Sequence, residues 1–132
     1  MILFDTSVWI DYLNARPTPK AQKLEAYFKN NFRVFTTPTI IQEVLQGISE
    51  QKRFDKVQQI LINQNVLLMK SVEAGIKAAQ LYSSLRQKGV TIRKPNDCLI
   101  AVYALNFDVE ICHNDADFDL IAQNSSLKIT IV

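Results

Sequence analysis

Five carboxylic acids stand where they can act together on one ligand. Asp5 and Asp115 each come close after a short apolar run, and Asp117 follows two residues later. Asp97 opens another apolar stretch, and Glu43 lies in a stretch with helical apolar spacing. Carboxylates at one place repel one another unless a cation joins them, and oxygen ligands without clustered Cys or His suit Mg²⁺ or Mn²⁺. Because such a cation activates water and holds phosphate oxygens, these acids point to phosphodiester hydrolysis.

Short apolar runs that alternate with helical patterns predict the elements that position these acids. Strands are expected at 2–4, 33–36, 66–69, 109–112 and 128–132, and helices at 6–14, 19–30, from 38, 51–63, 71–87, 96–106 and 115–123. Pro19, Pro38 and Pro95 stand where a helix accepts proline in its first turn. Ser71 is expected to cap the long helix at 71–87, and Gly89 to end it.

This alternation predicts an α/β fold, a three-layer α/β/α sandwich on a parallel sheet, with one domain over 1–132. In a doubly wound sheet, ligands bind beyond the carboxyl ends of the strands, where strand order reverses. Asp5 and Asp115 face each other there if their strands flank that crevice. A helical wheel places Glu43 on the flank of the buried face of its helix.

Each acid also has a purely structural explanation. Asp5, Asp97 and Asp115 stand at predicted helix starts, where a carboxylate accepts hydrogen bonds from free backbone N–H groups. Asp117 is then a first-turn acid of the same kind, and Glu43 a surface residue in the middle of a helix. The gathering of several carboxylates at one end of the sheet favours the ligand interpretation for the set.

Basic residues lead directly to Asp97. Arg86, Lys88, Arg93 and Lys94 fall within nine residues that contain no acid. Residues 1–94 carry 14 Lys and Arg against seven acids, whereas residues 95–132 carry one Lys and six acids. The segment is a candidate track for the phosphates of a polyanion, and its alternative is a solvated helix end and loop.

Composition and motifs exclude several classes of protein. The chain of 132 residues is 48% hydrophobic and 21% charged, which excludes a disordered chain or a collagen-like repeat. No apolar stretch reaches the roughly 18 residues of a membrane span, and the N-terminus lacks a basic signal-peptide region. We therefore expect a soluble protein of the cytoplasm without a membrane partner. Cys98 and Cys112, both in apolar runs, are expected to be buried thiols.

His113 is the only histidine, which excludes a ribonuclease mechanism that needs two. We interpret it as a polar residue at a strand end in preference to a proton shuttle. The three glycines are far apart and form no phosphate-binding loop.

Four segments together resemble a known family. They are DTSVWI at 5–10, EVLQGI at 43–48, NDCLIA at 96–101 and HNDADFDLIA at 113–122. In this order and spacing the chain looks like a PIN-domain protein, and specifically like a VapC-type toxin of bacterial type II toxin–antitoxin pairs. The resemblance covers essentially the whole chain. It implies a five-stranded parallel sheet of order 3-2-1-4-5 and a metal-dependent endoribonuclease.

The resemblance also implies which acids do the chemistry. Its catalytic quartet corresponds to Asp5, Glu43, Asp97 and Asp115. Asp5 and Asp97 would hold Mg²⁺ most directly, with Mn²⁺ as a substitute. Asp115, Glu43 and Asp117 would complete the ligand set through water, or bind a second ion, and orient the attacking hydroxide.

Neighbouring polar residues receive lesser roles from the resemblance. A hydroxyl after the first Asp often lies near the metal in this family, which points to Thr6 in preference to Ser7. Asp119 matches no ligand position and is expected to be an ordinary helix residue.

The partners implied by the resemblance are an RNA substrate and a VapB-type antitoxin. Such toxins form homodimers, and the antitoxin wraps the toxin in a hetero-oligomer and inserts Arg or Lys into the acidic pocket. The apolar helices at 6–14 and 38–63 offer a groove for an amphipathic antitoxin helix. The complex binds DNA through the antitoxin, so this chain is expected to read no DNA.

Three other functions compete with this interpretation. A PIN nuclease in RNA processing or DNA cleavage, without a toxin role, would carry the same acids. A receiver-like signalling domain shares the sheet and acidic pocket but needs paired acids after the first strand, where Thr6 and Ser7 stand. A catalytically silent scaffold is disfavoured by the intact acidic set.

Overall fold

The computed structural model describes residues 1–132, and a parallel sheet of four short strands lies at its centre. The strands are β1 (Ile2–Phe4), β2 (Val34–Thr36), β3 (Asn65–Val66) and β4 (Glu110–Cys112). Their order is β3-β2-β1-β4, and Leu3 of β1 pairs with both Phe35 and Ile111. Strands β1 and β4 are therefore neighbours although they lie far apart in the sequence, which confirms the expected reversal of strand order between them.

The expected fifth strand is reduced to a single bridge. Ile111 bonds to Lys128 and Thr130 through two backbone hydrogen bonds of 2.9 Å, and the bridge joins Ile111 to Ile129 in parallel. The C-terminal segment thus runs beside β4, at the predicted place. It forms no regular strand because pairing stops at Thr130, and the side chain of Ile131 is 93% exposed with no layer to pack against.

Seven helices surround the sheet. They are α1 (Thr6–Leu13), α2 (Pro19–Lys29), α3 (Pro38–Gln46), α4 (Gln51–Ile62), α5 (Ser71–Gln87), α6 (Pro95–Phe107) and α7 (Ala116–Gln123). Proline opens α2, α3 and α6 as predicted, because the first backbone N–H of a helix has no hydrogen-bond partner within the helix. Gly89 follows the end of α5 with φ of 80°, a left-handed conformation that glycine adopts without strain.

The extent of one strand and the cap of one helix differ from the prediction. Strand β3 consists of Asn65–Val66 in place of 66–69, because the chain leaves the sheet after Leu67 and the side chain of Leu68 is exposed. Ser71 is the first residue of α5 and not its cap, since Lys70 occupies that position without a side-chain hydrogen bond.

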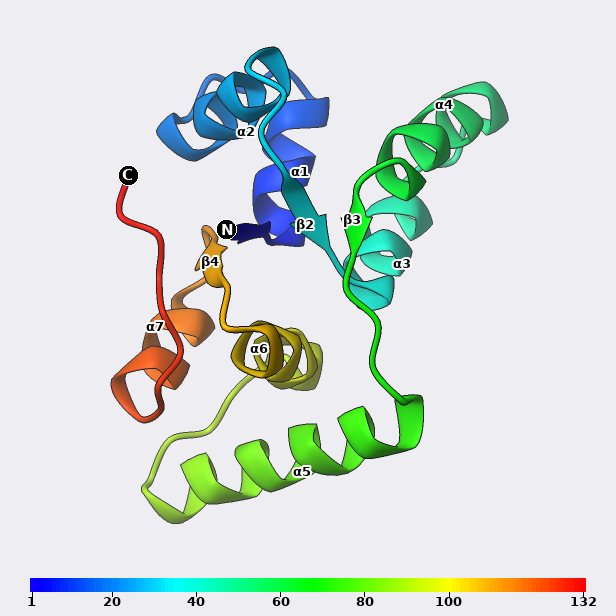
Figure 1. Cartoon of the computed structure of the whole chain (residues 1–132). Helices are drawn as coiled ribbons and strands as arrows, with labels where there is room; N and C mark the ends of the chain where they lie inside the picture. The colour runs from blue at the N-terminus through cyan, green and yellow to red at the C-terminus, as the bar shows by residue number, and fades with distance from the viewer.

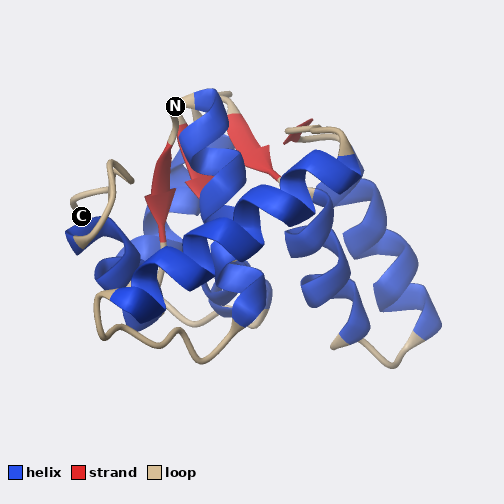
Figure 2. Cartoon of the chain, turned by 90° about the horizontal axis from the view of Figure 1, so that it is seen from below, coloured by secondary structure: helices blue, strands red, loops and turns tan.

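The helices form layers on both sides of the strands. Figure 1 shows α1 and α2 on one side, and α5, α6 and α7 on the other. Seen from below in Figure 2, the long helix α5 runs in front of the strands, and α3 and α4 stand together as a helical pair at one side. The class is therefore the predicted three-layer α/β/α sandwich.

One hydrophobic cluster of 27 buried residues joins these layers. It includes the three residues of β1 and much of α6, whose Ile100, Ala101 and Ala104 are fully or almost fully buried. This burial confirms the prediction for a helix that is apolar almost all round, and it fixes α6 firmly beside the carboxyl ends of β1 and β4. No helix combines the length and the apolar character that a membrane crossing requires.

Candidate metal centre

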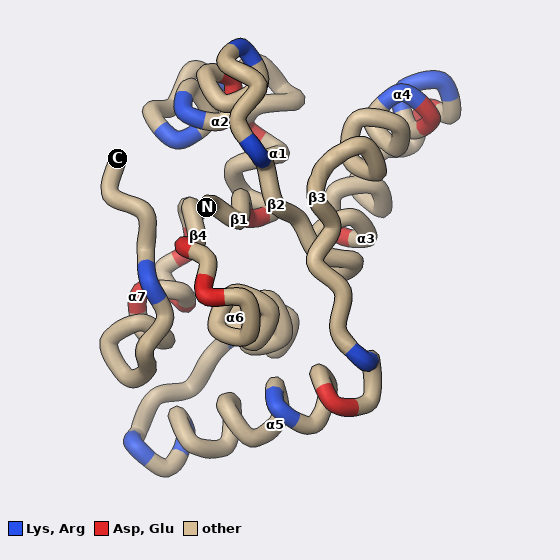
Figure 3. Tube along the Cα trace, viewed as in Figure 1, with Lys and Arg blue, Asp and Glu red and all other residues tan.

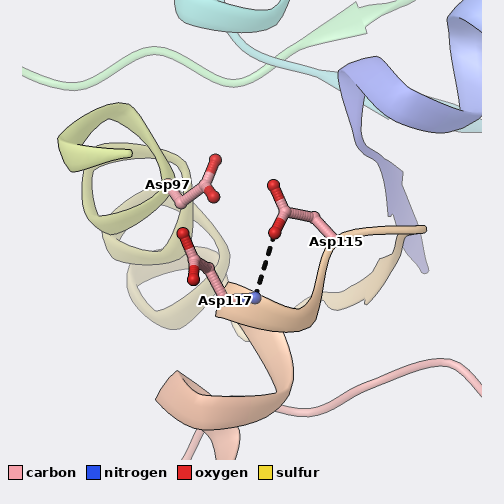
Figure 4. A group of neighbouring side chains, drawn as sticks. All are labelled: Asp97, Asp115 and Asp117. Carbon is pink, nitrogen blue, oxygen red and sulfur yellow. Dashed lines mark hydrogen bonds between the residues drawn. The ribbon is translucent and has the colours of Figure 1, made fainter. Parts of the chain in front are cut away.

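Three buried aspartates lie together beyond the end of β4. One carboxylate oxygen from each of Asp97, Asp115 and Asp117 lies within 4.8 Å of the other two. Figure 4 shows the three side chains pointing toward one another from α6, from the segment after β4 and from α7. We call these three residues the aspartate cluster.

Local helix chemistry places the cluster. Asp97 lies in the first turn of α6, directly behind Pro95. Asp115 is the N-cap of α7, and its Oδ1 accepts a hydrogen bond of 3.0 Å from the backbone N–H of Asp117. The capping role predicted for Asp115 does not use the whole carboxylate, because the cap occupies Oδ1 while Oδ2 faces the mostly exposed ammonium-bearing side chain of Lys94.

The electrostatics of the cluster favour a cation. The Oδ2 atom of Asp97 is buried and has no hydrogen-bond partner. Burial, followed by repulsion from Asp115, raises the pKa of Asp97 to about 8. Without a cation, one of the three carboxylates therefore holds a proton at neutral pH. Burial opposes ionisation of Asp115 too, but hydrogen bonds from the Asp117 N–H and from Lys94 hold the pKa of Asp115 below its usual value.

Asp5 lies beside the cluster but outside it. It is the N-cap of α1, and its Oδ2 accepts hydrogen bonds from Ser7 N–H (3.2 Å) and from Ser7 Oγ (2.7 Å). Ser7 Oγ in turn accepts a bond of 3.0 Å from the backbone N–H of Asn114, which ties the end of β1 to the end of β4. Burial raises the pKa of Asp5, and the neighbouring Glu43 adds to this effect. The sequence pointed to Thr6 in preference to Ser7 as the hydroxyl near the metal. Ser7 lies two residues after Asp5, which is the spacing at which an N-cap carboxylate accepts a backbone hydrogen bond.

Glu43 is positioned from α3 by a residue of α1. Its Oε1 accepts a hydrogen bond of 2.7 Å from Thr6 Oγ1. Thr6 thus contacts a carboxylate of the predicted quartet, and this carboxylate lies close enough to Asp5 to raise the pKa of Asp5. The aspartate cluster contains Asp117 and not Asp5. The resemblance had implied the most direct place beside Asp97 for Asp5 and an auxiliary place for Asp117.

The four basic residues of the 86–94 segment divide into two pairs. Lys94 Nζ lies 2.9 Å from Asp115 Oδ2, and Arg93 Nε lies 3.9 Å from Asp117 Oδ1, so these two side chains border the cluster. Arg86 instead stacks over the ring of Tyr82 at 5.6 Å, and Lys88 donates to the backbone carbonyl of Asn124. Only Arg93 and Lys94 therefore contact the acids directly.

Basic residues also approach from elsewhere in the fold. Figure 3 shows Lys and Arg along α2, along α4 and at both ends of α5. The ammonium group of Lys20, on α2, donates a hydrogen bond to the backbone carbonyl of His113, next to the cluster. Sequence reasoning did not single out Lys20, because nothing in its local pattern shows that α2 reaches the end of β4.

Comparison with known proteins agrees with this geometry. The model of the PIN domain family matches residues 2–124. Ribonuclease VapC11 of Mycobacterium tuberculosis is 33% identical over 132 residues, which cover 97% of this chain and 96% of the relative.

Two solved structures share the fold. VapBC2 from Rickettsia felis, bound to a DNA fragment from its promoter, has a TM-score of 0.73 at 20% identity and covers 98% of both chains. A toxin–antitoxin complex from Klebsiella pneumoniae has a TM-score of 0.64 at 22% identity and covers 89% of this chain and 90% of its own. With its parallel sheet, its buried aspartates and a family match over almost its whole length, the chain belongs to the PIN domain family and resembles the VapC ribonucleases within it.

Proposed function

We propose that this chain is a divalent metal-dependent endoribonuclease and the toxin of a type II toxin–antitoxin pair. The observation that carries the proposal is the aspartate cluster, in which a buried oxygen of Asp97 has no partner. The 33% identity to a VapC ribonuclease over nearly the whole chain supports the choice of RNA as substrate. We take residues 1–132 as one catalytic domain, because their buried side chains form a single cluster.

The donor set suits Mg²⁺ or Mn²⁺. Asp97, Asp115 and Asp117 offer carboxylate oxygens alone, which hard cations prefer, and the unpaired Asp97 oxygen is the group most in need of one. When bound, the cation supplies a water of lowered pKa and positive charge for the phosphate oxygens. Asp5 lies close enough to Asp97 to raise the pKa of Asp97, and Glu43 lies close to Asp5. With the cation bound, the carboxylates of Asp5 and Glu43 would orient the attacking water, and Thr6 holds Glu43 in place.

The basic rim of the cluster suits an RNA backbone. Arg93 and Lys94 lie next to Asp117 and Asp115, and both side chains are mostly exposed. Exposed cations beside a catalytic site bind phosphates without reading bases, so these two residues position the strand. Arg86 and Lys88 lie further along the same segment and extend the phosphate track. We place the activity in the cytoplasm, where bacterial RNA is found.

The chain has an apolar groove that can hold a helix of an antitoxin. A groove of about 380 Å³ lies between α1, α3 and the start of α4, and Ile10, Leu13, Val44 and Ile48 line it. Apolar grooves of this kind accept the apolar face of an amphipathic helix. The groove supports a VapB-type antitoxin as partner, in a hetero-oligomer built on a toxin homodimer. The proposal assigns promoter DNA to the antitoxin and none to this chain.

The test is cleavage of end-labelled single-stranded RNA by the purified chain in Mg²⁺ or in EDTA. Asp97→Asn keeps the shape of the side chain and removes its charge, so we expect cleavage to disappear. Asp108→Asn is the matched control, because Asp108 ends the same helix, is exposed and has a left-handed backbone conformation that asparagine tolerates. Equal cleavage by the parent and Asp97→Asn, or undiminished cleavage in EDTA, would refute the proposed mechanism.

A further inference from the structure

The buried imidazole of His113 joins the aspartate cluster to an acid outside it. His113 follows β4 directly, is 3% exposed and packs against the ring of Phe118 at 5.2 Å. Its Nδ1 accepts a hydrogen bond of 2.9 Å from the backbone N–H of Asp115. Its Nε2 lies 3.1 Å from Oδ1 of Asp119, one turn into α7. Both ring nitrogens therefore have a partner.

These two bonds require the same tautomer. The Asp115 N–H can only donate, so Nδ1 must carry no proton, and the Asp119 carboxylate accepts the proton on Nε2. Asp119 and Asp115 thus select one form of the imidazole from opposite sides.

The ring occupies the place that an asparagine side chain takes in an Asx turn. In that turn a side-chain acceptor binds the backbone N–H two residues further on, as Nδ1 of His113 does with Asp115. The bond fixes the backbone of Asp115, whose carboxylate in turn accepts from the Asp117 N–H at 3.0 Å. Two ligands of the cluster therefore depend on one buried acceptor.

We propose that His113 and Asp119 are positioning residues, which hold Asp115 and Asp117 in a metal-binding arrangement. The inference rests on the proposed metal site. It adds that Asp119, on the exposed face of α7, holds His113 and through it Asp115. Partners that orient metal ligands from behind commonly contribute about 10- to 100-fold in metal affinity. His113 touches neither substrate nor metal in this role.

The tautomer is measurable without any substitution, because His113 is the only histidine. A long-range proton–nitrogen correlation spectrum of the nitrogen-labelled, metal-free protein should show a protonated Nε2 and an unprotonated Nδ1. Asp119→Ala should lower the share of this tautomer, whereas Asp55→Ala, at an exposed acid of α4, should not. A wild-type ring protonated at Nδ1, or no change in Asp119→Ala, would overturn the proposed relay.

Two substitutions separate positioning from packing. His113→Asn keeps an acceptor where Nδ1 lies, and His113→Gln moves the acceptor away, while both remove the ring from Phe118. We expect calorimetric Mn²⁺ affinity to fall at least about tenfold further in His113→Gln than in His113→Asn, at similar thermal stability. Equal affinities in the two variants would refute the inference alone. A wild-type protein that binds no Mn²⁺ would refute the proposed metal site and the inference with it.

Discussion

Replacing Asp97 with asparagine should stabilise the metal-free protein while it removes the response to metal. The carboxylate of Asp97 is 3% exposed, and its Oδ2 has no hydrogen-bond partner. An amide of the same shape carries no charge and has an N–H that donates to a neighbouring carboxylate. The variant therefore relieves repulsion inside the cluster at the cost of a metal ligand.

The raised pKa sets the size of the effect. The pKa of Asp97 is about 8 in the fold, against 3.8 for an unperturbed aspartate. At pH 7 this difference bounds the destabilisation by Asp97 at about 4 kcal/mol. Because water and the neighbouring carboxylates adjust to the charge, we expect a measured gain of about 1–2 kcal/mol in Asp97→Asn.

The sign of the pH dependence follows from the same shift. A raised pKa means that the folded protein binds this proton more tightly than the unfolded chain does. The free energy of unfolding of the wild type in EDTA should therefore fall as the pH rises from about 4 to about 8, and then level off. Asp97→Asn should lose most of this dependence of stability on pH. The part that remains should come from Asp5, whose pKa is also raised.

Urea denaturation in EDTA and in excess Mg²⁺ tests the prediction. A ligand that binds only the folded state at 100 times its Kd adds about 2.7 kcal/mol, so the wild type should gain from metal and Asp97→Asn should not. The order of stability should thus reverse between the two buffers, and Asp108→Asn should follow the wild type in both. An Asp97→Asn protein that is less stable than wild type in EDTA, or that gains equally from Mg²⁺, would refute the reasoning.

Three further predictions concern other groups of the chain. Thr6→Val removes the donor to Glu43 and should lower kcat about tenfold with metal affinity unchanged, whereas Thr6→Ser should retain activity; equal kcat in both would contradict a role for the hydroxyl. Lys94→Gln should raise the KM for RNA and lower the salt dependence of RNA binding by a slope of roughly one, with little change in urea stability because the side chain is 60% exposed. An unchanged salt slope would remove Lys94 from the phosphate track. Burial raises the pKa of Cys98 and of Cys112 to about 11, so few thiolates exist at neutral pH. Both thiols should resist alkylation in the native protein and react in denaturant; rapid native labelling would show that they are accessible.

Sequence pattern alone was sufficient for the class and order of the elements. Apolar runs of strand length alternate with helical spacing, and a chain of this kind buries both faces of a parallel sheet only by placing helices on each side. Pro19, Pro38 and Pro95 marked helix starts correctly because proline acts through its own missing N–H, which is a local property. Cys98 and Cys112 are buried, as their apolar surroundings predicted.

Properties that depend on a neighbouring segment were predicted less well. The segment 128–132 has the composition of a strand, but a strand exists only where a partner accepts its hydrogen bonds, and pairing ends at Thr130. The cap of α5 differs for a similar reason, since a serine caps a helix only when its backbone lies outside the first turn, and Ser71 is already helical.

Within the site, the sequence determined which acids gather at one end of the sheet, and the tertiary structure decided which of them meet. Asp5 and Asp115 follow neighbouring strands, so their nearness follows from topology. The close approach of Asp97 to Asp117 depends on how α6 packs beside α7, and Asp5 is held aside by Ser7. The part played by His113 was likewise invisible, because a histidine at a strand end becomes informative only when the atoms facing its two nitrogens are known.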